Sequence, residues 1–572
     1  MIGWKTEGDA PAGAGPSFGG IVPALVMGLA VALRWWSLDF GLPDWMARPD
    51  EANITSRVQV MLRGGHWSPG FFEYPALFLY LLRALFALGV PGGSAADYID
   101  DPGPWLLVSR TVSAAAGVAT VALTARLGSR LGRDDVPLGW IAALLLAVAP
   151  LHVRDSHFGT TDVLGTCLVV AALLAVEELR RRPGLVRALA VGMWVGLAGA
   201  TKYNLALVGV AMVPVVLADR SLGWGRRTNL LLAAAAVAIA TFLAINPYVF
   251  LDSSRFFEDF AFQAAHLRDG HGVDLGVGWG YHLTDSLRYG LTGPVLLLGL
   301  IGVPVVFADR GNRARWLPLL VFSGIFYASL GPSRTVFFRY AMPVMPGLAL
   351  LAACSLVRLA TAIAPIWAFA RGAAPTLALA LAVFAATPGA ISSVHLDRLL
   401  GKRDTREQAR EWLEEHVDPG EGVIFAGGQG AIYGEPRIPG REWCQILAIE
   451  MEPSHCGHVG PFEMLRLADP RGGLSGIDRA RFRWVVTHEH ALARYSALHF
   501  KLAAALERDA TPVVSFVPYQ PGVGGVFDPS DAFYAPLREL SGHERPGPVI
   551  TVWRLDVRGS VESPRNSGRP PA

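Results

Sequence analysis

Two adjacent carboxylates, Asp50 and Glu51, follow the first long apolar segment of the chain and precede an amphipathic one. Ionised side chains beside a membrane are costly, so residues kept there usually have a structural or chemical role. A carboxylate could take a proton from a hydroxyl group. It could equally cap a helix, because the first turn of a helix favours negative charge. On this stretch alone, capping is the simpler interpretation.

Four more ionisable residues lie at or near the ends of apolar segments. Asp162 opens one segment, Lys202 closes another, and Arg339 and Arg110 lie within two further ones. Charged groups in such positions normally face a cavity, and Lys and Arg suit an anionic group such as a phosphate. The long side chain of Arg110 could also extend to the membrane surface. Acids and bases that converge from several segments favour a functional site.

The composition predicts the class of protein that must position these residues. The 572-residue chain is 52% hydrophobic and 17% charged, whereas soluble domains carry roughly 25% charged residues. Its apolar residues form blocks of about 20, the length of a membrane-crossing helix. The formal net charge of +2 argues against a nucleic-acid partner, which requires a concentrated basic face. We therefore expect an all-α polytopic membrane protein over residues 1–394.

The positive charges in the loops predict an orientation. If all twelve apolar segments crossed the membrane, the Lys and Arg residues would fall on both sides. If segment 75–90 instead stays at the outer surface, about eleven spans remain and five Arg-rich loops face the cytoplasm. This predicts a cytoplasmic N-terminus, with outer loops at 46–90 and 246–290. The outer face would then carry Glu73, Asp155, His157, Asp162, Lys202, His266, His271, Arg334 and Arg339.

The stretch that begins at Pro49 has the pattern of a short surface helix. Ile54, Val58, Met61 and Leu62 fall on one helical face, and the pair Gly64-Gly65 ends the pattern. The spacing predicts an amphipathic helix that lies flat on the outer membrane surface. Its first turn would hold Asp50 and Glu51.

Residues 395–572 differ in kind from the apolar part. A helical pattern covers Thr405–His416, and strand-like runs follow at 422–426, 482–488, 512–518 and 549–555. These features predict a soluble extracytoplasmic α/β domain. Its glycine-rich turn resembles a dinucleotide loop, but Tyr433 occupies the third glycine position, so the required spacing is absent.

Two cysteines, Cys444 and Cys456, lie in this predicted domain. In an oxidising compartment they could form a disulfide across their short loop. The alternative is that both remain free thiols. Cys167 and Cys354 lie in apolar segments and are expected to be packed.

The motifs of the apolar part resemble one known family. The chain is similar to the polyprenyl-phosphate-sugar-dependent glycosyltransferases of the GT-C fold, and within them to protein O-mannosyltransferases and bacterial lipid A aminoarabinose transferases (glycosyltransferase family 39). The resemblance covers roughly Gly20–Leu359. It rests on the acid pair in "RPDE" and on "MLRGGHWSP", "FEYPALFLYL", "FGTTDVL", "GLAGATKYN" and "FFRYAMPVMPGLAL".

The resemblance implies a GT-C fold with juxtamembrane helices in the first outer loop, in a bacterial-type cytoplasmic (inner) membrane, which agrees with the eleven spans expected from the charges. It implies that Asp50 is the catalytic base, supported by Glu51, and that Asp162 matches a second-loop carboxylate. From their charge and location, Lys202 and Arg339 are candidates for the lipid-linked phosphate. Arg110 and Tyr340 are further candidates on the donor side.

The aminoarabinose branch also suggests a metal site. There, a Glu-Lys-Pro triplet and a histidine in the long outer loop bind a metal, which would correspond to Glu73 and His266. Here the triplet is Glu73-Tyr74-Pro75, and its missing lysine argues against a lipid A aminoarabinose role. Two ligands are too few to require an ion, so a divalent metal is an open alternative to having no cofactor.

We therefore expect inverting transfer of a sugar from a polyprenyl phosphate to a hydroxyl of a protein, lipid or glycan at the outer face. A transporter or lipid flippase is the main alternative. Transporters often show internal repeats and interrupted helices at mid-membrane, whereas this sequence shows no repeat and its charges cluster on one side. A scaffold with a partner-binding outer domain and an enzyme related to O-antigen ligases also remain open.

Overall fold

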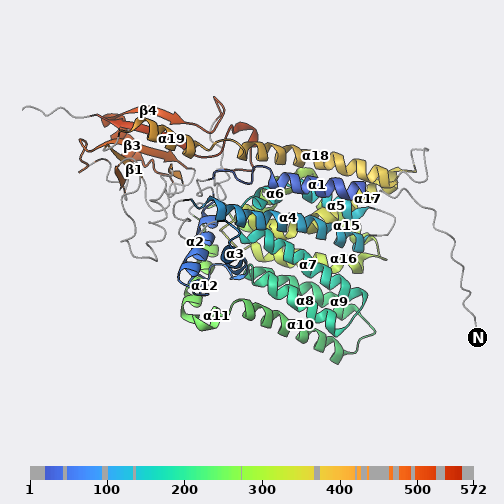
Figure 1. Cartoon of the computed structure of the whole chain (residues 1–572). Helices are drawn as coiled ribbons and strands as arrows, with labels where there is room; N and C mark the ends of the chain where they lie inside the picture. Colours follow the sequence, from blue (N-terminus) through green and yellow to red (C-terminus); the bar gives the residue numbers. More distant parts are fainter. Residues whose placement is uncertain are drawn as a thin grey trace, which may run out of the picture.

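The computed structural model describes residues 20–42, 48–92, 101–132, 137–271, 274–365, 374–418, 421–426, 434–436, 463–467, 474, 476–490, 496–523 and 535–556. Helices make up most of this part of the chain and run side by side in a bundle (Figure 1). A five-stranded sheet lies beyond one end of the bundle. We call this the sheet end.

Four described helical stretches are long and apolar enough to cross a membrane. They are α4 (Gly103–Leu131), α10 (Trp224–Ile245), Phe338–Ile363, which joins η4 to α17, and Ala374–His416, which joins α18 to α19. Two bent helix pairs would raise the number to six: α5 (Leu138–Ala147) with α6 (Pro150–Ser156), and Gly278–Leu291 with α15 (Gly293–Ala308). The chain is an integral membrane protein, and the expectation of about eleven spans remains a prediction.

The segment expected not to cross contains a short helix. Helix α3 covers Leu77–Ala87, which is about 16 Å at 1.5 Å per residue, well short of the roughly 30 Å hydrocarbon core. Its start is tied to two bundle helices, because the backbone N–H of Leu77 donates to the Ala200 carbonyl at 3.1 Å. The backbone N–H of Ala76 donates to Asn246 Oδ1 at 2.7 Å. The structure therefore places α3 at the sheet end of the bundle.

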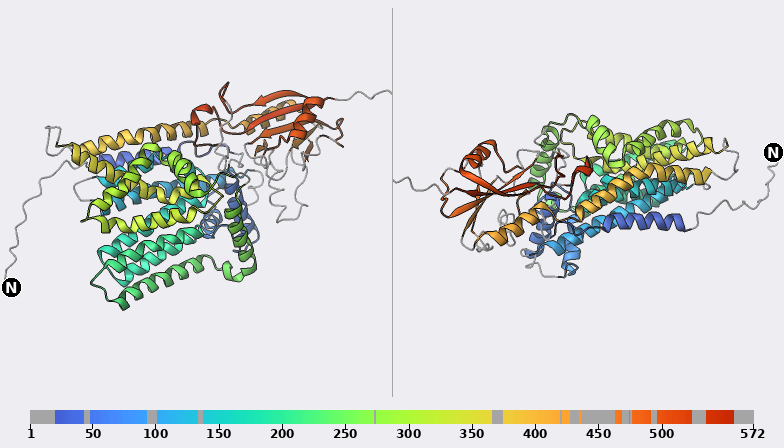
Figure 2. Two further views of the ribbon diagram at one scale, coloured as in Figure 1. Left: turned by 180° about the vertical axis from the view of Figure 1, so that it is seen from behind. Right: turned by 90° about the horizontal axis from the view of Figure 1, so that it is seen from above.

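Helix α2 (Pro49–Arg63) forms where the apolar stripe predicted a helix. Ile54 and Val58 are buried and pack with Phe78 and Leu82 of α3. Helices α2 and α12 (Ser253–Asp269) lie at the sheet end in all three views of the ribbon (Figure 2). Helices α2, α3 and α12 therefore lie at the same end of the bundle as Asp50, which is part of α2.

Close helix packing shapes the region that will matter for the site. Helix α8 (Leu185–Gly199) packs against α10 and against η2 (Tyr203–Ala211). A Cβ atom at Gly192 would lie 2.3 Å from the Ala234 carbonyl oxygen, and one at Gly196 would lie 2.6 Å from that of Ala238. Small residues let membrane helices approach closely, so these two glycines fix the α8–α10 contact.

The remaining membrane-domain elements complete the bundle. They are α1 (Ile21–Trp35), α7 (Thr161–Arg181), α9 (Met212–Ala218), α11 (Tyr248–Leu251), α13 (Gly278–Tyr281), η3 (His282–Leu287), α14 (Arg288–Leu291), α16 (Arg313–Leu330), η4 (Phe338–Val344), α17 (Met345–Ile363) and α18 (Ala374–Leu400).

The sheet has the strand order β2-β1-β3-β5-β4. Strand β1 runs parallel to β2 and β3, whereas β5 runs antiparallel to β3 and β4. Helix α19 (Thr405–His416) packs on one face with Val423 and Phe425, and α21 (Phe500–Asp509) packs on the other with Ile424. This alternation is what a strand buried on both faces requires. The strands are β1 (Gly422–Ala426), β2 (Glu463–Leu467), β3 (Phe482–Glu489), β4 (Ala510–Phe516) and β5 (Val549–Leu555).

A segment that follows α21 and β4 in the chain returns to the bundle. Ala535 and Leu540 join Phe40, Phe158 and Leu396 in one apolar cluster. Leu540 begins the short helix η9 (Leu540–Gly542). Arg538 lies 3.4 Å from Asp285 and over the ring of Tyr289. The part of the chain that carries the sheet is therefore seated directly on the bundle, close to the carboxylates.

Candidate active site

Asp50 lies in the first turn of α2, and its carboxylate has two partners from distant parts of the chain. The Tyr74 hydroxyl donates to Oδ1 at 3.0 Å, and Arg339 Nη2 lies 3.1 Å from Oδ2. The side chain of Asp50 keeps 22% of its surface exposed. It is therefore held in place and remains reachable by another molecule.

Arg339 connects this carboxylate to a second one. Its Nε lies 3.7 Å from Asp162 Oδ2, and Lys202 Nζ donates to Asp162 Oδ1 at 2.7 Å. Lys202 Nζ also lies 4.6 Å from the centre of the Tyr340 ring. Two acids and two bases thus alternate in one cluster with no net formal charge. We call Asp50, Arg339, Asp162 and Lys202 the charge cluster.

Helix ends position every member of the charge cluster. Asp50 follows Pro49, which begins α2, and Asp162 lies in the first turn of α7. Lys202 precedes η2, and Arg339 lies in the 3-10 helix η4. Side chains at helix ends reach the membrane surface without placing charge at mid-membrane, where it is most costly. The structure brings these four residues of the sequence together.

Glu51 and Arg110 lie elsewhere. The Glu51 side chain is fully buried and accepts from Arg110 Nε at 2.8 Å and Nη2 at 3.0 Å. It also accepts from the backbone N–H of Gly159 at 2.7 Å. Arg110 Nη1 donates to the carbonyls of Leu38 and Phe40. Both side chains are committed to this buried pair, so the expected donor contact of Arg110 and the surface position suggested for it do not match the structure.

Both acids lie in the first turn of α2, where the helix dipole favours negative charge, as the capping interpretation expected, but their side chains also do more than this. The N-cap of α2 is Arg48, which makes no side-chain capping hydrogen bond. Glu51 instead joins α2 to α4 and to the turn before α7, and Asp50 joins α2 to η4. Both acids make tertiary contacts that no local pattern reveals.

A further chain of charges extends from Asp50 to the returning segment. Arg48 lies 3.7 Å from Asp50 and 3.5 Å from Asp155. Asp155 lies 3.1 Å from Arg154, whose Nη1 donates to the Ala535 carbonyl at 3.4 Å. The sequence reasoning identified Asp155 on this face but missed Arg48, Arg154 and Tyr74. The position of Arg48 directly before Pro49-Asp50 was the available signal.

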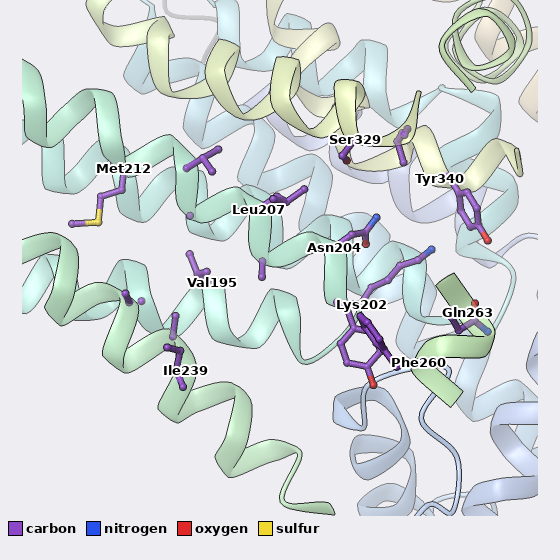
Figure 3. A pocket seen from close by; sticks show the side chains of 18 of the residues that line it. Val195, Lys202, Asn204, Leu207, Met212, Ile239, Phe260, Gln263, Ser329 and Tyr340 are labelled. Carbon is purple, nitrogen blue, oxygen red and sulfur yellow. The ribbon is translucent and has the colours of Figure 1, made fainter. Parts of the chain in front are cut away.

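A cavity of about 920 Å³ begins at the charge cluster and continues between α8, η2, α9 and α10. Figure 3 shows Lys202, Asn204, Gln263 and Tyr340 toward one end and Val195, Leu207, Met212 and Ile239 along the rest. Arg339 also lines it. The Oδ1 atom of Asn204 is buried and has no hydrogen-bond partner among the described residues. The cavity is apolar along its length, and its polar end carries Lys202, Arg339 and Glu73.

Two side chains at the polar end, Tyr74 and Glu73, have raised pKa values. Burial, together with nearby Asp50, raises the pKa of the Tyr74 hydroxyl well above its ordinary value, so Tyr74 stays a hydrogen-bond donor. Burial raises the pKa of Glu73, and the negative charges of Asp259 and Asp50 add to this effect. Glu73 lines the cavity and accepts from Gln263 Nε2 at 2.6 Å.

The residues suggested for a metal do not form a suitable donor set. Glu73 is held by an amide rather than by a second metal-binding group. His266 stacks on Phe262 and contacts the ring of His271. Within the described ranges, no group of three or more His, Cys, Asp or Glu side chains could hold an ion. Cys444 and Cys456 lie outside the described residues, and Cys167 and Cys354 are buried free thiols.

The helical bundle has the GT-C fold, which is also that of two solved structures. ArnT from Cupriavidus metallidurans bound to undecaprenyl phosphate is similar with a TM-score of 0.50 and 15% identity, over 93% of this chain and 98% of that chain. The apo oligosaccharyltransferase of Archaeoglobus fulgidus is similar with a TM-score of 0.50 and 13% identity, over 86% and 72%.

A comparison of the sequence with family models matches a shorter part of the chain. The family model for dolichyl-phosphate-mannose-protein mannosyltransferase matches residues 105–247. This range contains Arg110, Asp162 and Lys202, while Asp50 and Arg339 lie outside it. No curated protein sequence matches the chain.

Proposed function

We propose that the chain transfers a sugar from a polyprenyl phosphate to a hydroxyl acceptor at the membrane surface beside Asp50. The observation that carries this proposal is the cavity, which is apolar along its length and ends at Lys202 and Arg339. A polyprenyl chain requires an apolar groove, and its phosphate requires cations. ArnT, which shares the fold, was solved with undecaprenyl phosphate bound.

In this reaction Asp50 takes the proton of the acceptor hydroxyl as its oxygen bonds to the anomeric carbon. The bond between that carbon and the phosphate oxygen breaks, and its electron pair leaves with the polyprenyl phosphate. Lys202 and Arg339 offset the negative charge that develops on this leaving group. Attack from the side opposite to the phosphate inverts the anomeric configuration.

The charge cluster suggests how donor binding prepares the base. Arg339 lies between Asp50 and Asp162, so a phosphate that engages Arg339 competes with both carboxylates. Loss of a nearby positive charge favours the protonated form of a carboxylate. Asp50 therefore becomes a stronger base when the donor is in place. Asp162 acts as a positioning residue, because it holds Lys202 at the end of the cavity.

Glu51 and Arg110 take a positioning role in this proposal. Their buried pair fixes the first turn of α2 against α4. Asp50 lies in that same turn, so its direction depends on the pair. Tyr340 contributes through its ring, which lies beside Lys202.

The proposed orientation places the charge cluster outside the cell and the N-terminus in the cytoplasm. Helix α7 begins beside Asp162 and ends at Arg180 and Arg181, about 30 Å away at 1.5 Å per residue. Arg226 and Arg227 likewise lie at the start of α10, whose other end is next to Asn246. Arginines at the end opposite to the site agree with a cytoplasmic location for that end.

A transfer assay with the purified chain tests the function. Radiolabelled polyprenyl-phosphate sugars serve as donors, and a membrane and cell-wall extract supplies acceptors. We expect transfer by the wild type and by the control Asp269→Asn, whose side chain is 62% exposed. Asp50→Asn should lose about 10²- to 10⁴-fold in rate. Full activity of the Asp50→Asn variant would exclude Asp50 as the base. If the chain takes up a donor but transfers sugar from none of them, a lipid transporter would be favoured instead.

A further inference from the structure

A second cavity, of about 510 Å³, lies at the sheet end of α18. It combines basic and apolar side chains and has no carboxylate among its lining residues. These are Ala390, Ile391, Val394, His395, Arg398, Leu399, Lys402 and His543. None of them lines the large cavity. The proposed transfer reaction therefore leaves this cavity without a role.

The helical repeat of α18 separates its charges onto two faces. Ser393, Leu396 and Asp397 are buried against the bundle. Asp397 Oδ1 lies 3.6 Å from Nε2 of His157, the residue that follows α6. Arg398 and Lys402 are exposed on the other face. Within the described part of the chain, neither of these two cations has an ion-pair or hydrogen-bond partner. Their positive charge is available to an external group.

The same helix presents apolar side chains further from the sheet. Val383, Phe384 and Ile391 are 54%, 80% and 64% exposed. Large apolar side chains so exposed on a membrane helix face lipid chains. From Phe384 to Arg398 helix α18 rises about 21 Å at 1.5 Å per residue, and Lys402 follows just after its end. An apolar surface followed by cations matches the order of acyl chains and phosphate in a phospholipid.

The remaining wall comes from the segment that returns from the sheet. His543 follows η9, is buried, and contacts the ring of Tyr519 edge-on with the centroids 5.0 Å apart. Tyr519 and His543 also form an isolated antiparallel bridge. A group bound in the cavity would thus contact both the membrane helix α18 and the part of the chain that holds the sheet.

We propose that this cavity binds the phosphate of an anionic phospholipid headgroup. Arg398 and Lys402 pair with the phosphate, and the acyl chains follow the exposed apolar side of α18. Such a lipid would link the sheet to the membrane surface and restrict its tilt. The proposal does not depend on the transfer reaction, because the cavity shares no residue with the groove for the donor.

Native mass spectrometry of the full chain with added phosphatidylglycerol or phosphatidylcholine tests this site. Each neighbouring cation contributes about fivefold to the affinity for an anionic lipid. We therefore expect Arg398→Gln and Lys402→Gln each to weaken phosphatidylglycerol binding about fivefold, with phosphatidylcholine unchanged. Arg403→Gln is the matched control, because Arg403 is already paired with Glu407 and Glu411 outside the cavity.

Two competitors identify the source of the phosphate. Displacement of phosphatidylglycerol by millimolar inorganic phosphate would show that a free phosphate suffices, and preferential binding of polyprenyl phosphate would assign the site to the donor lipid. Either result would overturn the phospholipid assignment. Equal phosphatidylglycerol binding by the wild type and the double variant Arg398→Gln/Lys402→Gln would overturn the site itself. A melting curve for each variant shows whether the fold is intact.

Discussion

Asp50 and Glu51 are neighbours in the chain, but their carboxylates lie in different environments. Glu51 is fully buried, and both its oxygens accept from Arg110, with Gly159 as a third donor. Asp50 is partly exposed beside the large cavity and shares Arg339 with Asp162. Successive residues of a helix point about 100° apart. One turn of α2 can therefore present one acid to the core and the other to a substrate.

The comparison shows that similar ion pairs can have opposite roles. A buried pair with every polar atom satisfied contributes mainly to a unique structure, and removing one partner is costly. A pair at the end of a cavity can exchange its partner for a ligand. We therefore expect variants of the buried pair to lose stability and variants of the charge cluster to lose activity.

The largest effect on stability is expected for Arg110→Met. It leaves the Glu51 carboxylate buried without its charged partner, which costs about 3–5 kcal/mol. Thermal unfolding in detergent measures this loss. The control is Arg187→Met, because Arg187 is 36% exposed and pairs with Glu178 at 3.8 Å, a contact worth about 1 kcal/mol or less. Equal losses in the two variants would remove the distinction between buried and surface pairs.

The next largest effect is expected for Lys202→Gln. It removes one of the two cations proposed to hold the leaving phosphate, and loss of one such group lowers the rate about 100-fold. The melting temperature should stay close to that of the wild type, because Lys202 is 20% exposed. Lys501→Gln, on an exposed position of α21, is the matched control. Unchanged transfer by Lys202→Gln would place the phosphate elsewhere.

Arg48→Gln should lower both stability and transfer rate, each by less than in the two variants above. The reason is that Arg48 lies between Asp50 and the buried Asp155. Loss of a hydrogen-bonding partner in a buried site costs about 1–3 kcal/mol. A displaced Asp50 should slow transfer about tenfold, as expected for a misplaced base. Parallel melting and transfer measurements give both values. The control is Arg268→Gln, because Arg268 is exposed. If Arg48→Gln lowers stability but leaves transfer unchanged, Arg48 does not help to position Asp50.

The smallest expected effect is on how the stability of the fold depends on pH. The pKa of Glu73 is raised above its ordinary value of 4.5, first by burial and then by Asp259 and Asp50. The folded chain therefore binds this proton more tightly than the unfolded chain, and stability falls as pH rises from about 4.5 through the raised pKa. Glu73→Gln should flatten this trend, which melting temperatures measured across this pH range would show. Glu258→Gln, on an exposed position of α12, should leave the trend unchanged.

Local patterns predicted the elements well where the periodicity was clear. The helix at Thr405–His416 has the expected bounds, and the four strand-like runs form β1, β3, β4 and β5. Strand β2 and helix α21 were missed. Strand β2 pairs in parallel with β1 far from it in the chain, and its five residues alone carry no distinguishing pattern. Such pairing depends on tertiary packing rather than on local sequence.

The site was predicted as a set of charges but not as an arrangement. Apolar flanks identified Asp162, Lys202 and Arg339, because charges at such positions are costly unless they face a cavity. Asp50 and Glu51 differ because their partners come from distant parts of the chain. Asp50 pairs with Arg339, 289 positions away, and Glu51 pairs with Arg110, 59 positions away. Tyr74 was missed because nothing in its own surroundings marks it, and Arg48 was missed although it directly precedes Pro49-Asp50. Their partners are set by the fold.

The comparison of Asp50→Asn with Glu51→Gln is the most direct test of these two roles. Each variant replaces one carboxylate with an amide of the same size, and each is assayed for donor-dependent transfer and for melting temperature in the same preparation. We predict that Asp50→Asn melts like the wild type and has lost transfer, whereas Glu51→Gln melts far lower. Normal transfer by Asp50→Asn together with an unchanged melting temperature for Glu51→Gln would contradict both assignments.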